Sequence, residues 1–193
     1  RLFYMQSTDD GASFSKPVDI THVIEQFRDQ YAWRVCATGP GHGLRLRNGR
    51  LVVPIWLSDS SANDFGPNHR GHRPSDVALI YSDDHGKTWQ RGEFVCRNGA
   101  VVDGETVVYP SETVAVELTD GSVMFNLRSE SSINRRLVAI SPDGVHDWTM
   151  RGFDEKLREP VCMASIVRQA WPAGSEPGRI VFANPDTLDK EMR

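Results

Sequence analysis

The chain has 193 residues, of which 39% are hydrophobic and 25% are charged. This length and balance predict a folded domain of ordinary size and exclude a disordered chain. A net charge of −4 at pH 7 argues against a nucleic-acid-binding protein, and no apolar run is long enough for a membrane-spanning helix.

The first residues, RLFYMQS, form a strand-like run without an initiator Met or a signal-peptide layout. Because the chain opens inside this run, we expect it to be part of a longer protein, and the missing signal says nothing about secretion. Three cysteines, Cys36, Cys96 and Cys162, have no metal-ligand spacing and are expected as buried free thiols.

A polar octapeptide follows this first run and recurs along the chain. STDDGASF (7–14) and SDDHGKTW (82–89) fit Ser-x-Asp-x-Gly-x-(Ser/Thr)-aromatic, and SPDGVHDW (141–148) is a degraded copy. Each copy lies between two strand-like runs, which predicts a tight turn. Asp84 would accept backbone N–H groups, and Gly86 would adopt a conformation that other residues resist. We therefore expect a structural role for the octapeptides, with Trp89 packed under its turn.

Segment 21–30, THVIEQFRDQ, predicts one or two turns of helix between the repeated units. It is followed by a predicted hairpin, GLRLRNGRLVVPIW, in which Asn48-Gly49 marks the turn. A second hairpin, AVELTDGSVMFNLR, turns at Asp120-Gly121 in the same way. Both dipeptides predict two-residue turns in which both positions take a positive φ. Residues 164–185 are a weaker third copy with Gly178 near its turn.

Residues 63–75, NDFGPNHRGHRPS, predict a polar loop between a second and a third strand. Its side chains either contact a glycan or are simply solvated, and the second interpretation is the simpler one. The spacing of His69 and His72 has no third ligand nearby, so no metal site is predicted. Tyr109, next to Pro110, is expected to pack rather than to act as a nucleophile.

The repeated unit is therefore strand, turn, strand, strand, octapeptide, strand. Repeated four-stranded antiparallel units predict an all-β fold, a β-propeller, because radial packing buries the faces that one sheet cannot bury alone. About three blades are expected in one domain spanning 1–193. The expected parts are the end of one blade (1–20), two blades (about 36–96 and 108–153) and the start of another (160–193).

The two good hairpins place three polar or aromatic residues on one rim. Trp56 and Arg128 each stand seven residues after the turn glycine of their hairpins, at the far end of a second strand. A two-residue turn would place Thr113 opposite Arg128, so that Glu112 and Arg128 are near neighbours. This pair is either an ordinary cross-strand salt bridge or an anion-binding arginine beside a carboxylate that acts as a base.

Four features together resemble the sialidase (neuraminidase) family. The octapeptides look like its Asp-boxes, and TGPGHGLRL (38–46) resembles its Gly-Pro-Gly-His segment. PSETVAVELTDGSVMFNLRS (110–129) resembles the blade with the catalytic Glu and an arginine in an Asn-x-Arg pattern, and PVCMASIV (160–167) resembles the next blade. The resemblance covers essentially the whole chain.

The resemblance implies a six-bladed β-propeller and an exo-sialidase that removes terminal sialic acids with retention of configuration. In that family three arginines bind the sugar carboxylate, a Tyr attacks the anomeric carbon, a Glu takes the proton of the Tyr, and an Asp is the general acid. Carried over, Glu112 is the partner of the Tyr, Arg128 is a triad member and Trp56 lies near the substrate. His42 either lines the same mouth and binds substrate or hydrogen-bonds the backbone around it.

The chain departs from the family pattern in four ways. It has no Arg-Ile-Pro start, no assignable acid Asp, no third arginine and no nucleophilic Tyr, and both truncation and loss of catalysis would explain this. The resemblance implies sialylated glycoconjugates as substrate, no cofactor, and a secreted or periplasmic location. Two other functions stay open: a non-catalytic propeller that binds glycan or protein, and a glycosidase of neutral polysaccharide.

Overall fold

The computed structural model describes residues 1–62, 65–66 and 69–189. The described chain is all-β apart from one short helical segment, and its strands pair in antiparallel sheets. In chain order the elements are β1 (Phe3–Tyr4), β2 (Val18–Asp19), α1 (Thr21–Glu25), η1 (Gln26–Asp29), β3 (Val35–Thr38), β4 (Leu44–Arg45), β5 (Leu51–Ser58), β6 (Ser75–Ser82), β7 (Gln90–Cys96), β8 (Val101–Val102), β9 (Glu105–Thr106), β10 (Thr113–Glu117), β11 (Val123–Leu127), β12 (Arg135–Ser141), β13 (Thr149–Arg158), β14 (Ser165–Ala170) and β15 (Arg179–Ala183). The predicted helical segment is thus confirmed as α1 followed by η1.

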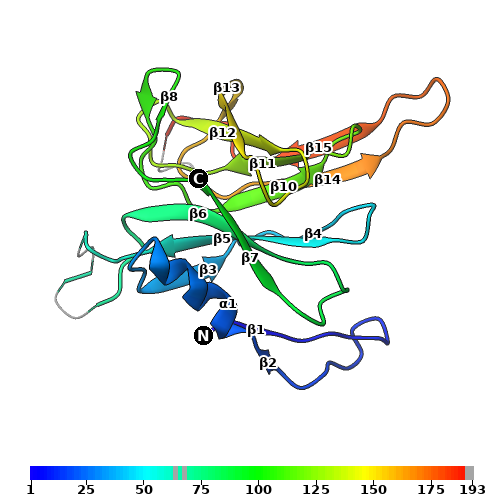
Figure 1. Cartoon of the computed structure of the whole chain (residues 1–193). Coiled ribbons are helices and arrows are strands. Elements are labelled where there is room, and N and C mark those ends of the chain that lie inside the picture. The colour runs from blue at the N-terminus through cyan, green and yellow to red at the C-terminus, as the bar shows by residue number, and fades with distance from the viewer. Residues whose placement is uncertain (63–64, 67–68, 190–193) are drawn as a thin grey trace.

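The first large sheet has the strand order β3-β5-β6-β7, and β4 pairs with the start of β5. Its central strand β6 is buried along nearly its whole length, as its apolar run VALIY predicts for a strand covered on both faces. The helical segment covers one face, where Val23, Ile24 and Phe27 pack with Ile55 and Ala78. Figure 1 shows this segment on the side of the sheet away from β10–β13.

The second large sheet, β10-β11-β12-β13, packs on the opposite face of the first. Val52 and Leu79 of the first sheet share one apolar cluster with Phe125 and Leu137 of the second. The β14–β15 hairpin continues the series, because Val114 of β10 packs against Ile166 of β14. The sheets are therefore layers buried against one another, each in contact with the next along the chain.

The octapeptide turns have the predicted structure. The box at 82–89 joins β6 to β7, and its Asp84 carboxylate accepts hydrogen bonds from the Thr88 N–H (2.8 Å) and the Thr88 hydroxyl (2.7 Å). Gly86 has φ +85°, and its N–H donates to Ser82 Oγ. Trp89 packs against the apolar cluster below the helical segment. The box at 141–148 joins β12 to β13 in the same way.

The two hairpin turns differ from the prediction. Leu118 N–H donates to Ser122 O, so the loop between β10 and β11 has three residues, and only Gly121 takes a positive φ in it. The Asp120 carboxylate accepts the Ser122 N–H at 3.0 Å, which favours a turn of the type I plus bulge kind over a two-residue loop. The extra loop residue shifts the register, and Thr113 pairs with Leu127 instead of Arg128.

Candidate active site

Glu112 and Arg128 lie side by side just beyond the last residue pair of β10 and β11. The backbone ladder continues past the assigned strands, because Arg128 N–H donates to Glu112 O (3.0 Å) and Ser111 N–H donates to Arg128 O (3.0 Å). This places Arg128 Nε 3.4 Å from Glu112 Oε2. Glu112 and Arg128 are therefore neighbours, as predicted, although the strand register differs by one residue from the expected one.

The Arg128 guanidinium is fixed by contacts with Ser111 and Glu130, and its side chain lines a pocket. Its side chain is only 12% exposed, Nη1 donates to Ser111 Oγ at 2.8 Å, and Nη2 lies 3.8 Å from Glu130 Oε1. Nε is buried, and among the residues that the structure describes it has no hydrogen-bond acceptor, since the approach of Glu112 lacks hydrogen-bond geometry. Because Nε itself is buried beside Glu112, a ligand can meet the guanidinium only through the part of Arg128 that lines the pocket.

These residues open into a pocket of about 520 Å³. Its described lining consists of Trp56, His72, Arg73, Ser111, Glu112, Arg128, Glu130 and Val161. The structure thus brings together three of the four predicted site residues, Trp56, Glu112 and Arg128. The lining presents guanidinium groups, carboxylates and an aromatic ring in one concave space, which suits a polar ligand with an acidic group.

His42 does not lie in this pocket. Its Nδ1 is 2.8 Å from Gly43 O and its Nε2 is 3.2 Å from Ile166 O, and it lines a separate cavity of about 230 Å³ with Trp171. The geometry agrees with the alternative in which His42 hydrogen-bonds the backbone of a glycine-rich strand start. His42 lies apart from this pocket because the segment that carries it runs along the middle of β5 and not at its end: Gly39 N–H donates to Pro54 O, and Leu44 pairs with Val52.

Glu130, which was not selected from the sequence, also lines the pocket, together with His72 and Arg73 of the loop for which glycan contact was one of two interpretations. Glu130 follows Arg128 by two residues, and the alternation of an extended chain puts positions 128 and 130 on one side. Arg73 Nε donates to Glu130 Oε1 at 2.8 Å, and the His72 ring meets Trp56 edge-on at 6.3 Å. The loop at 63–75 therefore supplies part of the wall, while its residues 63–64 and 67–68 lie outside the described part.

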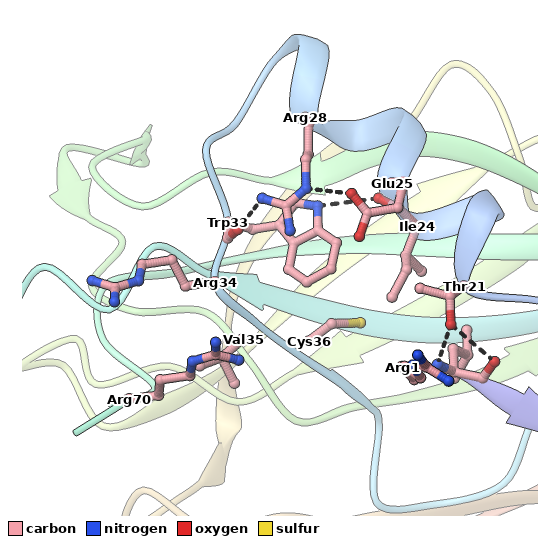
Figure 2. Close-up of a pocket in the computed structure, with 11 residues that line it drawn as sticks. Arg1, Thr21, Ile24, Glu25, Arg28, Trp33, Arg34, Val35, Cys36 and Arg70 are labelled. Carbon is pink, nitrogen blue, oxygen red and sulfur yellow. Dashed lines mark hydrogen bonds and ion pairs between the residues drawn. The ribbon is translucent and has the colours of Figure 1, made fainter. Parts of the chain in front are cut away.

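A second cavity, of about 630 Å³, lies between the helical segment and β3 (Figure 2). Its one described carboxylate, Glu25, is ion-paired with Arg28, which also donates to Trp33 O. Burial raises the pKa of the Cys36 thiol to about 12, so the thiol stays protonated at neutral pH. The described lining therefore offers neither a nucleophile nor a free acid or base, and the cavity is a weaker candidate for catalysis.

The described residues contain no group of three or more His, Cys, Asp or Glu side chains arranged to hold a metal ion. Within the same residues, none of the helices has the length and apolar character needed to cross a membrane.

The comparisons with known proteins indicate one family. A family model described as a BNR repeat-like domain matches residues 1–185. A sialidase of Bacteroides fragilis is 31% identical over 189 residues, which cover 97% of this chain and 30% of that protein. Sialidase-2 of Mus musculus is 32% identical over 172 residues, which cover 86% of this chain and 41% of that protein.

Among solved structures, the Hadza microbial sialidase Hz136 superposes with a TM-score of 0.72 at 28% sequence identity. The match covers 97% of this chain and 32% of that one. The chain spans 30% and 41% of the lengths of the two curated relatives above.

Proposed function

Since this chain belongs to the sialidase family of BNR-repeat proteins, we propose that it is part of an exo-sialidase that removes terminal sialic acids from glycoconjugates. The proposed fold of the whole protein is a six-bladed β-propeller, of which this chain supplies about three blades. The four-stranded sheets, their packing in series and the turns between third and fourth strands support this proposal.

The observation that carries the proposal is the pairing of Glu112 with Arg128 at the pocket. A guanidinium can hold a carboxylate through paired N–H groups, and sialic acid carries its carboxylate on the anomeric carbon. The Arg128 side chain lines the pocket, where its guanidinium can meet the ligand, and Glu112 lies 3.4 Å from its Nε. A carboxylate beside the anion site is thus within reach of the reacting carbon.

In the proposed mechanism Glu112 acts as the base for a Tyr supplied by the rest of the protein. Glu112 takes the proton of the Tyr hydroxyl while the Tyr oxygen attacks the anomeric carbon, and the glycosidic C–O bond breaks. An Asp outside this chain protonates the leaving oxygen and then activates the water that releases the sugar, so configuration is retained. A neutral nucleophile avoids the repulsion that a carboxylate would meet from the anionic substrate.

The charges of the described pocket lining balance, since Arg73 and Arg128 face Glu112 and Glu130. Both arginines lie beside Glu130, but only Arg73 is hydrogen-bonded to it, so Arg128 is the group better suited to the substrate carboxylate. Tight binding of an acidic sugar therefore needs the further arginines that the family resemblance places outside this chain. Trp56 contributes an apolar wall to the same pocket, where it would contact the sugar.

The test is turnover by the complete parent protein of two fluorogenic substrates, a 4-methylumbelliferyl sialoside and the matching neutral galactoside. We expect release from the sialoside and none from the galactoside. Release from the galactoside alone would favour an enzyme for neutral sugars. If the folded protein cleaves neither substrate but binds sialyllactose, it is a non-catalytic glycan-binding propeller, and the proposed activity is wrong.

A further inference from the structure

Arg136 is the largest side chain that is fully buried in the described part of the chain. It lies on β12 and pairs with Glu159, which is also completely buried, at 3.0 Å between Nη1 and Oε2. Neither residue lines the candidate active site. Burying two charges is costly unless both are well paired, so such a pair calls for an explanation.

The contacts of Arg136 reach three of the segments that line the pocket or adjoin its lining. Its Nε donates to the Asn126 side chain and its Nη2 to Asn126 O at 2.9 Å, two residues before Arg128. Nη2 also lies 3.5 Å from the backbone carbonyl of Glu112. One guanidinium thus touches the backbone that carries Glu112 and the strand end that carries Arg128.

The third segment is the turn at 159–162. Arg136 Nη1 donates both to the Glu159 carboxylate and to Cys162 O, at 2.9 Å, so it holds the turn at its two ends. Val161 lies between them, lines the pocket and has φ +64°. A β-branched residue strongly disfavours this left-handed conformation, which persists only where its surroundings impose it.

We propose that Arg136 and Glu159 are positioning residues for the active site: together they fix Glu112, Arg128 and the strained turn at Val161 relative to one another. The inference rests on the proposed sialidase function for its catalytic consequence. It also assigns a role to Asn126 in the Asn-x-Arg pattern, because its side-chain oxygen accepts a hydrogen bond from the positioning arginine and so links the pair to β11.

The alternative is that this ion pair only stabilises the fold. Arg50 provides a matched control, since it is also mostly shielded from solvent and bridges Asp83 and Asp143 at the Asp-box end of the sheets, away from the pocket. A purely structural Arg136 would behave like Arg50 when each is replaced by Lys. A positioning Arg136 would change turnover beyond what the loss of stability explains.

The experiment compares Arg136→Lys, Glu159→Gln and Arg50→Lys in the complete parent protein, below the melting temperature of each. We expect Arg136→Lys and Glu159→Gln to lower kcat by about 10-fold or more, because small misplacements of reacting groups are costly. We expect Arg50→Lys to lower the melting temperature but leave kcat within about twofold of the wild type. If Arg136→Lys and Glu159→Gln had the same kcat as the control Arg50→Lys, the inference would be overturned. Glu159→Gln keeps the shape of the side chain and serves if Arg136→Lys does not fold.

A double-mutant cycle of Arg136→Lys and Val161→Gly adds a measurement of kcat that a purely structural role of Arg136 would not change. Glycine adopts positive φ without strain, so the turn of Val161→Gly does not need to be held. We therefore expect Arg136→Lys to reduce kcat less in the Gly-containing background than in the wild type. The same loss in both backgrounds would show that Arg136 does not act through this turn.

Crystal structures of the parent protein and of Glu159→Gln separate this inference from the proposed activity. If the parent cleaves no sialoside, the proposed function fails, but the positioning claim can still be read from the coordinates. We expect Val161 to leave the left-handed region in the variant and Arg128 to lose its contact with Ser111 Oγ. An unchanged pocket in Glu159→Gln would contradict the positioning role.

Discussion

Arg128 is a largely buried arginine that lines the pocket. Its side chain is 12% exposed, yet its buried Nε has no hydrogen-bond acceptor in the described residues. Its other contacts, to Ser111 and near Glu130, fix the orientation of the guanidinium. The group is therefore pre-organised for an anion, and little side-chain entropy remains to be lost when a ligand binds.

This property predicts the effect of Arg128→Lys in the complete protein. An ammonium cannot give the paired contact of a guanidinium, so the affinity for the unsaturated sialic acid analogue should fall by about 10- to 100-fold. Isothermal titration calorimetry measures this change, with Arg50→Lys as the control that should bind normally. Unchanged affinity in Arg128→Lys would mean that Arg128 does not contact the sugar carboxylate.

The sequence predicted the core of this site but not its wall. The glycine-based alignment of the hairpins was sufficient to bring Trp56, Glu112 and Arg128 together, because strand length fixes where a strand ends. Glu130 lies after the strand, in a segment without a pattern, and Arg73 reaches it from a distant loop. Contacts of this kind depend on how two sheets pack, which local sequence does not encode.

At the scale of the elements, the Asp-box turns are held mainly by one carboxylate. The N–H and the hydroxyl of Thr88 lower the pKa of Asp84 from 3.8 to about 2. The contribution of Asp84 to folding stability is therefore complete above its unfolded pKa and is lost as the pH falls through the folded value. Asp84 is only half-buried, so solvent screens this effect and it is modest.

We accordingly expect Asp84→Asn to lower the melting temperature by a few degrees at pH 7, and the difference from the wild type to shrink as the pH approaches 2. Thermal unfolding followed by circular dichroism at several pH values measures both. Asp10→Asn, in the first box, is the control, because Asp10 is exposed and Asn tolerates its positive φ. A difference that persists unchanged at low pH would rule out the ionised carboxylate as the cause.

In the two hairpins, the dipeptide sequence predicts the wrong turn length. The dipeptides Asn48-Gly49 and Asp120-Gly121 favour a two-residue turn, but in both hairpins the side chain before the glycine accepts the N–H two residues on. That local bond stabilises a three-residue loop. Asp103-Gly104, which was not identified, does have positive φ at both positions and joins β8 to β9.

At the scale of the whole molecule, one arginine links two neighbouring sheets at the end opposite to the pocket. Arg50, directly before β5, makes a bidentate contact with Asp83 of the second box and also binds Asp143 of the third box. Hydrogen bonding to Asp83 raises the pKa of Arg50, as expected for a paired guanidinium. The boxes thus join neighbouring sheets as well as strands, which their sequence pattern alone does not predict.

Arg50→Gln should therefore destabilise the complete protein by about 1–3 kcal/mol, because several charge-assisted hydrogen bonds are lost together. Urea unfolding measures this change. The kcat of the folded variant should stay close to that of the wild type, since the described ion pairs of Arg50 are with Asp83 and Asp143, which are not among the described residues that line the pocket. A stability equal to that of the wild type would show that the contact between the boxes contributes nothing to the packing of the sheets.

The central claim is that Glu112 is the base of a sialidase active site, and its most direct test is the kcat of Glu112→Gln in the complete protein on the fluorogenic sialoside. We predict a loss of about 10²- to 10⁴-fold, the usual range for a general base. The melting temperature and the affinity for the unsaturated analogue should stay near those of the wild type. A kcat close to that of the wild type would contradict the account and leave the Glu112–Arg128 pair as an ordinary salt bridge.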